Sequence, residues 1–123
     1  MGNPKSIAVI GPGVMAEAMI VSMIQNDVAP AEAIIASGPS AERVRELEER
    51  HGIRSTTDNA AAAQGAEVVV LAVKPQRLDF VLSELEGAIE PTALVISIVA
   101  GAGIDKIAAG LRHPRVVRSM PNT

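Results

Sequence analysis

Short apolar runs alternate with stretches of helical periodicity along this chain, and this alternation constrains the fold more than any other feature. The apolar runs have the length of buried strands, which we expect at residues 7–10, 33–37, 53–56, 67–73, 93–99 and 115–120. Because the connections are short, each strand–helix–strand unit predicts a right-handed crossover between parallel strands. The sequence therefore predicts an α/β fold, a doubly wound parallel sheet of about six strands with helices on both faces.

Helical periodicity is clearest directly after the first strand, at residues 14–25. Here Met15, Met19 and Met23 recur at helical spacing, and we expect this stripe to pack in the core, because methionine fills irregular gaps under a sheet. Glu17 is expected on the solvated side of the same helix. Further helices are predicted at residues 40–50, 60–63, 75–87 and 104–109.

Composition narrows the class of protein. A chain of 123 residues is long enough for one domain and too short for two ordinary ones. Its net charge of -3 and single aromatic residue, Phe80, argue against binding to nucleic acid or an anionic membrane. No apolar run approaches the ~20 residues of a membrane helix, and the sequence contains no cysteine. We therefore expect a cytoplasmic, single-domain protein with neither nucleic acid nor membrane as partner.

The turn after the first strand has the pattern G-x-G-x-x-A, at residues 11–16. Gly11 would permit the tight turn, Gly13 would let the backbone approach a pyrophosphate, and Ala16 would let the helix pack closely on its strand. The first N–H groups of the helix would then face the phosphates. This placement is typical of a Rossmann dinucleotide site, although a strand–helix turn that needs glycine for steric reasons alone is the alternative.

The end of the second predicted strand bears on which dinucleotide would bind. An NAD site normally places Asp or Glu about 20 residues beyond the glycines, on the ribose hydroxyls. The sequence has no acid there, and instead places Ser37, Ser40 and Arg43 around Gly38. Hydroxyls and a guanidinium suit a ribose 2′-phosphate, which favours NADP(H) over NAD(H) as cofactor. Alternatively, Ser40 is an ordinary helix cap and Arg43 a solvated surface charge.

Three further loops follow predicted strands, at residues 73–76, 97–103 and 118–123. Each carries small or polar residues, with Lys74 directly after the central strand and Gly101 in the second loop. Taken singly, these are a solvated lysine and ordinary loop glycines. Because the carboxyl ends of parallel strands meet at one edge, together they predict a shared crevice for the cofactor.

Metal and hydrolytic sites have no support in the sequence. His51 precedes a helix-ending glycine and is most simply a cation near a helix C-terminus, whereas His113 is expected in a loop. Neither is accompanied by a third ligand or a paired carboxylate, so we predict no metal site.

Four segments together resemble one family: "IGPGVMAEAMI", "TTDNAAAAQGAEVVVLAVKPQ", "SIVAG" and "VVRSMPNT". In this order they are similar to the N-terminal nucleotide-binding domain of pyrroline-5-carboxylate reductase, from about Ser6 to the last residue. The resemblance implies an NAD(P)H-dependent oxidoreductase that reduces 1-pyrroline-5-carboxylate to proline, in proline biosynthesis. Pro12 and Val14 depart from residues common in the family, and Pro12 removes one N–H from the phosphate cradle.

The resemblance also implies cofactor contacts at named positions. The phosphate cradle would consist of Gly11, Pro12, Gly13, Val14 and Met15. The adenosine part would be contacted by Ser37 and Asn59. The pyrophosphate and nicotinamide would lie near Val73, Lys74, Pro75, Ala100, Gly101, Met120, Pro121 and Asn122.

Family members carry a second, helical domain that forms the dimer and most of the substrate pocket. We expect residues 1–123 to be the cofactor domain alone, with that C-terminal domain absent, and we assign no catalytic residue. A small-molecule substrate and a homo-oligomer are expected only together with the second domain. Two alternatives stay open: the cofactor domain of a related imine or 3-hydroxyacid dehydrogenase, and a stand-alone nucleotide-binding module without catalysis.

Overall fold

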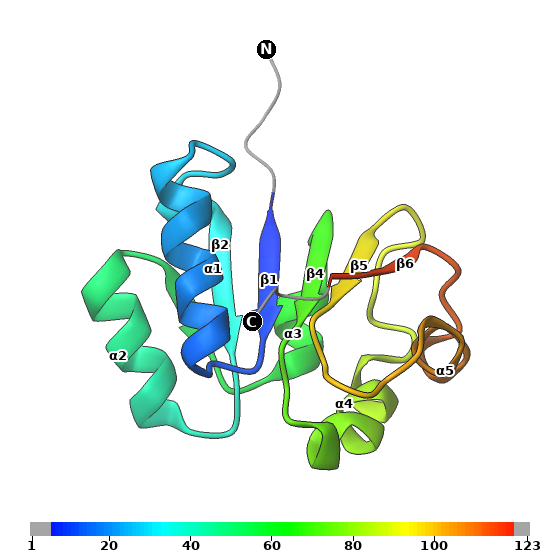
Figure 1. Cartoon of the computed structure of the whole chain (residues 1–123). Coiled ribbons are helices and arrows are strands. Elements are labelled where there is room, and N and C mark those ends of the chain that lie inside the picture. Colours follow the sequence, from blue (N-terminus) through cyan, green and yellow to red (C-terminus); the bar gives the residue numbers. More distant parts are fainter. Residues whose placement is uncertain (1–5, 120–123) are drawn as a thin grey trace.

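Six strands form one parallel sheet in the computed structural model, which describes residues 6–119 (Figure 1). They are β1 (Ile7–Ile10), β2 (Ile34–Ser37), β3 (Arg54–Thr56), β4 (Val68–Leu71), β5 (Leu94–Ser97) and β6 (Val116–Arg118). Their spatial order is β3-β2-β1-β4-β5-β6, so the order of the strands reverses between β1 and β4. This reversal defines a doubly wound sheet and confirms the predicted fold class.

The helices lie between the strands at the positions that the periodicity predicts, with ends shifted by a few residues. They are α1 (Val14–Gln25), α2 (Ala41–His51), α3 (Asn59–Ala63), α4 (Leu78–Leu85) and α5 (Ile104–Leu111). Two short 3-10 turns, η1 (Ala31–Ala33) and η2 (Pro75–Arg77), precede β2 and α4. Pro75 therefore opens a 3-10 turn, where its missing N–H costs nothing, and α4 begins only at Leu78.

The central strands are apolar on both sides because helices cover both faces of the sheet. In β1, Ile7 and Val9 pack into a core with Ile20 of α1 and Leu47 of α2. The alternate residues of β1, Ala8 and Ile10, face a second core that α3, α4 and α5 complete. All four residues of β1 are at most 2% exposed, because side chains alternate between two covered faces.

The register of the three central strands brings their carboxyl ends to the same level. Ile10 at the end of β1 pairs with Ser37 of β2 on one side and with Leu71 of β4 on the other. The segments that follow these three strands therefore emerge together at one edge of the sheet.

The expectation that all three methionines of the stripe are buried is wrong. Met15 is 48% exposed, because it lies in the first turn of α1, beyond the end of the sheet; Met19 and Met23 do pack against the core. His113 lies in a loop, as expected, but it is only 5% exposed, and its Nε2 donates to the carbonyl of Ala93 at 2.6 Å. That partner lies 20 residues away, so local sequence could not reveal it.

Candidate functional site

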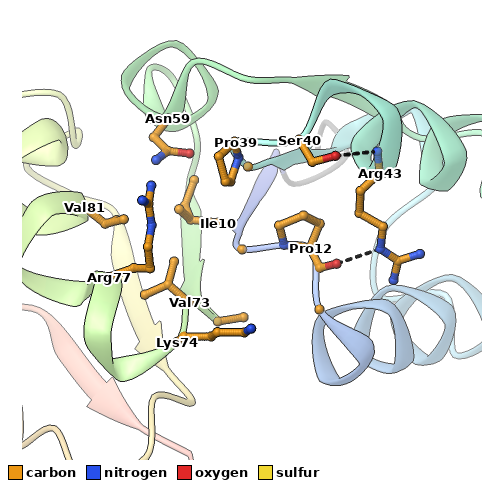
Figure 2. A pocket seen from close by; sticks show the side chains of 14 residues that line it. Ile10, Pro12, Pro39, Ser40, Arg43, Asn59, Val73, Lys74, Arg77 and Val81 are labelled. Atoms are coloured by element: carbon orange, nitrogen blue, oxygen red, sulfur yellow. Dashed lines mark hydrogen bonds between the residues drawn. The ribbon is translucent and has the colours of Figure 1, made fainter.

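A cavity of about 430 Å³ lies at the carboxyl edge of the sheet, where the strand order reverses (Figure 2). Its walls are three segments, residues 10–13, 38–43 and 72–81, together with Asn59. The volume lies within the range of small-molecule and cofactor sites. The topological switch point is also where open α/β sheets bind their ligands.

The turn between β1 and α1, residues 11–13, lines the cavity and is called the glycine turn below. Gly11 has a φ of +103°, and its N–H donates to the carbonyl of Ser37 at 2.8 Å. A Cβ at Gly11 would lie 2.7 Å from the carbonyl carbon of Ala72, so both the turn and its packing on β4 require glycine. The steric explanation for this first glycine is therefore sufficient by itself.

Gly13 differs from Gly11, because no steric contact with residues 6–119 requires a glycine at this position. Its φ is −84°, and a Cβ there would meet no described atom within 4 Å. It is the N-cap residue of α1, and no side chain of the described residues caps that helix end. The first N–H groups of α1 therefore have no side-chain cap among the described residues and lie at the positive end of the helix dipole, which is an arrangement suited to an anion.

Pro12 packs on the loop after β2. A Cβ at Gly38 would overlap the Pro12 ring, so the two residues are matched. This contact joins the glycine turn to the loop that carries Ser40. Ser40 is a helix cap, as the alternative interpretation of this residue predicted. Its Oγ accepts from the N–H of Arg43 at 3.1 Å.

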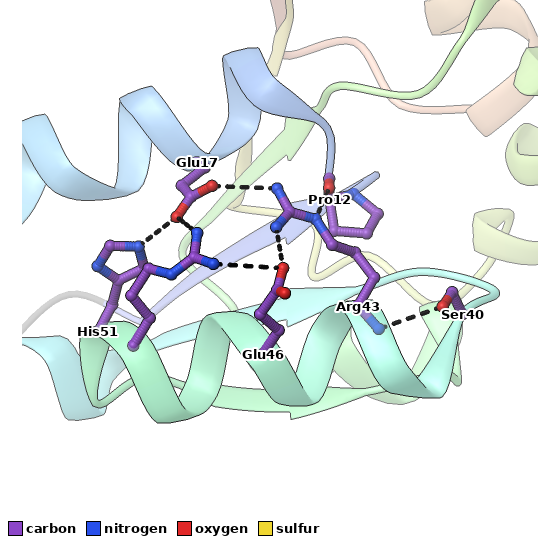
Figure 3. A network of polar contacts seen from close by, with 7 residues as sticks. Pro12, Glu17, Ser40, Arg43, Glu46 and His51 are labelled. Atoms are coloured by element: carbon purple, nitrogen blue, oxygen red, sulfur yellow. Dashed lines mark hydrogen bonds and ion pairs between the residues drawn. The ribbon is translucent and has the colours of Figure 1, made fainter.

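Arg43 is not a solvated surface charge. Its Nε donates to the carbonyl of Pro12 at 2.8 Å, which fixes the side chain to the glycine turn (Figure 3). Its Nη1 and Nη2 donate to the carboxylates of Glu46 at 2.6 Å and Glu17 at 3.1 Å. These contacts raise the pKa of Arg43 above its ordinary value, with the hydrogen bond to Glu46 as the largest cause. Arg43 thus lines the cavity while also joining α1 to α2.

The expectation that Glu17 is solvated is wrong. Its side chain is 20% exposed, and its second carboxylate oxygen accepts from His51 Nε2 at 2.6 Å and Arg50 Nη1 at 2.7 Å. These hydrogen bonds, His51 first and then Arg50 and Arg43, lower the pKa of Glu17 to about 2. The partners lie 26 to 34 residues along the chain, so helical periodicity within α1 could not identify them.

The lowered pKa of Glu17 predicts a pH-dependent stability. Because the folded-state pKa of about 2 lies below the ordinary 4.5, ionised Glu17 stabilises the fold fully above about pH 4.5. That contribution is lost as the pH falls towards about 2. Glu17→Gln should therefore destabilise the protein at pH 7 but lose that effect progressively between pH 4.5 and 2.

Urea unfolding of both proteins at a series of pH values checks this expectation. Glu49→Gln is the matched control, because Glu49 is exposed on α2 and makes no ion pair within residues 6–119. A difference between Glu17→Gln and the parent protein that is the same at pH 7 and pH 3 would contradict the role of the ionised carboxylate.

On the opposite wall, Asn59 is held by a buried hydrogen bond. Ser37 is fully buried, and its Oγ donates to Asn59 Oδ1 at 2.6 Å. Asn59 Nδ2 donates in turn to Glu84 at 2.9 Å. Asn59 lines the cavity, whereas Ser37 does not, so Ser37 orients the amide that faces the ligand space.

The segment after β4 contributes two cations to the same cavity. Lys74 and Arg77 both line it, and neither makes an ion pair with the part of the chain that the structure describes. Arg77 lies over the Phe80 ring, with 5.3 Å between the guanidinium carbon and the ring centroid. The sequence did not identify Arg77, which reads there as an ordinary surface cation.

About half of the site residues that the sequence predicts line the cavity. Eight of them line the cavity: Gly11, Pro12, Gly13, Ser40, Arg43, Asn59, Val73 and Lys74. Others lie outside its lining: Val14, Met15, Ser37, Pro75, Ala100 and Gly101. Three lie outside the described residues: Met120, Pro121 and Asn122. The lining residues that the sequence missed are Ile10, Gly38, Pro39, Ala72, Arg77 and Val81.

Metal ligation and membrane insertion find no support within residues 6–119. No three His, Cys, Asp or Glu side chains there are grouped so that they could hold a metal ion. In the same residues, none of the helices has both the length and the apolar character needed to span a bilayer.

Comparison with known proteins identifies the family. A family model described as NADP oxidoreductase, coenzyme F420-dependent, matches residues 6–101. The chain belongs to this family. A pyrroline-5-carboxylate reductase from Synechocystis sp. is 41% identical over 95% of the chain, and one from Pseudomonas aeruginosa is 42% identical over 100%. The resemblance seen in the four sequence segments is thus confirmed.

Solved structures agree with the sequence relatives. A pyrroline-5-carboxylate reductase from Coxiella burnetii matches 98% of the chain with a TM-score of 0.90 and 36% identity. Another, from Plasmodium falciparum with NADP bound, matches 99% with a TM-score of 0.81 and 25% identity. The chain spans less than half of each protein, between 43% and 45% of these four relatives.

Proposed function

We propose that this chain is the cofactor-binding domain of a pyrroline-5-carboxylate reductase, and that its cavity binds NADP(H) in preference to NAD(H). The observation that carries the proposal is the open N-terminus of α1 behind Gly13. It lies at the switch point of the sheet, and three cations line the same cavity. The relatives named pyrroline-5-carboxylate reductase, one of them with NADP bound, support this assignment.

The lining residues suggest how the cofactor would lie. The pyrophosphate would sit on the first N–H groups of α1, next to Gly13, with Lys74 supplying a positive charge from the facing wall. The adenosine would lie between Asn59 and the loop that carries Ser40 and Arg43, where the 2′-phosphate meets a hydroxyl and a guanidinium. The remaining positions are proposed from the resemblance alone. Val14 and Met15 would belong to the phosphate cradle, and the positions near the pyrophosphate and nicotinamide would be Pro75, Ala100, Gly101, Met120, Pro121 and Asn122.

The chemistry assigned to this chain is binding and orientation. A bound reduced nicotinamide would supply a hydride for the carbon of the substrate's C=N bond, whose nitrogen would gain a proton to give proline. The helix terminus and Lys74 would hold the phosphates and so position the ring. No described residue of the cavity is assigned as the proton donor.

The remainder of the enzyme is part of the same proposal. Because the chain spans only 43% and 45% of the two reductases compared in sequence, we propose that a further domain forms the substrate pocket and the homo-oligomer. The small-molecule substrate would be 1-pyrroline-5-carboxylate, and a cytoplasmic location is proposed from the composition.

Calorimetric titration of the chain with NADPH and NADH tests the proposal. We expect saturable binding of both cofactors, with NADPH bound more tightly. Failure to bind either one at millimolar concentration, by a chain whose circular dichroism shows it to be folded, would overturn the proposed function.

A further inference from the structure

Arg43 is shared among three acceptors before any ligand arrives. Its guanidinium has five N–H donors, of which Nε is used by the Pro12 carbonyl, Nη1 by Glu46 and Nη2 by Glu17 (Figure 3). Within residues 6–119, one donor on each terminal nitrogen is left without a partner. More importantly, the single positive charge faces two carboxylates, at 2.6 Å and 3.1 Å. A cation neutralised in this way attracts a phosphate less strongly than a free one does.

The two carboxylates play different parts. Glu17 is 20% exposed and also binds Arg50 and His51, so it is a structural junction between α1 and α2. Glu46 is 49% exposed, and its other contact is a longer ion pair with Arg50 at 3.6 Å. Removing the charge of Glu46 would leave Arg43 held by the Pro12 carbonyl and by Glu17. The guanidinium would then keep its place at the cavity, and its Nη1 would no longer be bound to a carboxylate.

We infer that Glu46 sets how strongly the site distinguishes NADPH from NADH, by competing with the ribose 2′-phosphate for Arg43. This inference rests on the proposed function. NADH has an uncharged hydroxyl at that position in place of the phosphate, so competition for the charge of Arg43 affects mainly NADPH. Glu46 acts through Arg43 and need not touch the cofactor. The contact restrains the NADP preference and keeps the site able to accept both cofactors.

The test compares Glu46→Gln with Glu42→Gln, by calorimetry with NADPH and with NADH at the same low ionic strength. Glu42 is the matched control: it is exposed in the first turn of the same helix and makes no ion pair within residues 6–119. Both variants remove one negative charge from α2, so any general charge effect is common to them. We expect the ratio of NADPH to NADH affinity to rise about two- to fivefold in Glu46→Gln, the size typical of an exposed ion pair. In Glu42→Gln the ratio should stay near that of the parent protein.

A second comparison shows whether the effect passes through Arg43. In an Arg43→Gln background, adding Glu46→Gln should leave the affinity ratio unchanged, because the competed cation is gone. The rise in Glu46→Gln should also shrink at high salt, as screening weakens the freed charge.

The outcomes separate the two proposals. If both cofactors bind but the ratio rises no more in Glu46→Gln than in Glu42→Gln, this inference is overturned and the proposed function stands. A rise that persists in the Arg43→Gln background would also overturn it. If the parent protein binds neither cofactor, the proposed function fails and the inference fails with it.

Discussion

Replacing Gly13 with alanine should leave the protein folded and weaken its binding of both NADPH and NADH about tenfold or more. The backbone at Gly13 has a φ of −84° and a ψ of −173°, which alanine adopts without strain, and a Cβ there would meet no described atom within 4 Å. The stability should therefore stay within ~1 kcal/mol of the parent protein. The methyl group would, however, stand in front of the first N–H groups of α1, where the pyrophosphate has to approach.

Two measurements separate these effects, urea unfolding for the stability and calorimetry for the two affinities. Gly103→Ala is the control, because Gly103 is likewise an extended N-cap residue, of α5, and a Cβ there would also meet no described atom within 4 Å. It lies outside the cavity lining, and its substitution should leave both affinities unchanged. Parent-like affinity for NADPH in Gly13→Ala would remove the helix terminus from the proposed phosphate site.

Gly11→Ala, unlike Gly13→Ala, should cause a large loss of stability. The added Cβ would lie 2.7 Å and 2.8 Å from the carbonyl carbon and oxygen of Ala72, and 2.8 Å from the nitrogen of Val73. These are backbone atoms directly after β4, so the strand would have to move. A left-handed backbone costs alanine about 1–2 kcal/mol, and overpacking adds about 1–3 kcal/mol. We expect a loss of roughly 2–5 kcal/mol in the free energy of unfolding.

Gly65→Ala distinguishes the two contributions to that loss. Gly65 has a φ of +76°, but a Cβ there would meet no described atom within 4 Å. Its substitution should therefore cost only the backbone strain, about 1–2 kcal/mol. Urea unfolding of both variants measures the difference. If Gly11→Ala proved no more destabilising than Gly65→Ala, the close approach of the glycine turn to β4 would not constrain the fold.

The positions of the strands were predictable because a parallel sheet covered on both faces requires unbroken apolar runs. Residues 68–71 and 7–10 are such runs, and they form the central pair β4 and β1. The start of α2 was predictable from local sequence as well. Ser40 supplies the hydroxyl that caps α2, a local requirement that a few neighbouring residues express.

The polar partners in the site were not predictable from the sequence. Glu17 and Arg43 are 26 residues apart, and Ser37 and Asn59 are 22 apart, so no local periodicity relates them. The same holds for Arg77 of η2 and Val81 of α4, which line the cavity; Val81 packs in the same core as Ile10 at the end of β1. In the sequence alone, they read as an ordinary surface cation and an ordinary core valine of a helix.

The sequence by itself determined the α/β architecture and the edge of the sheet at which a ligand would lie. Both follow from short-range patterns, since burial and turn geometry act on neighbouring residues. Only the tertiary structure decided how the charges are distributed. It shows that Gly11 is required by packing and Gly13 is not, and that Arg43 is shared between two carboxylates. The physical reason is that electrostatic pairs form across space between α1 and α2, where distance along the chain carries no information.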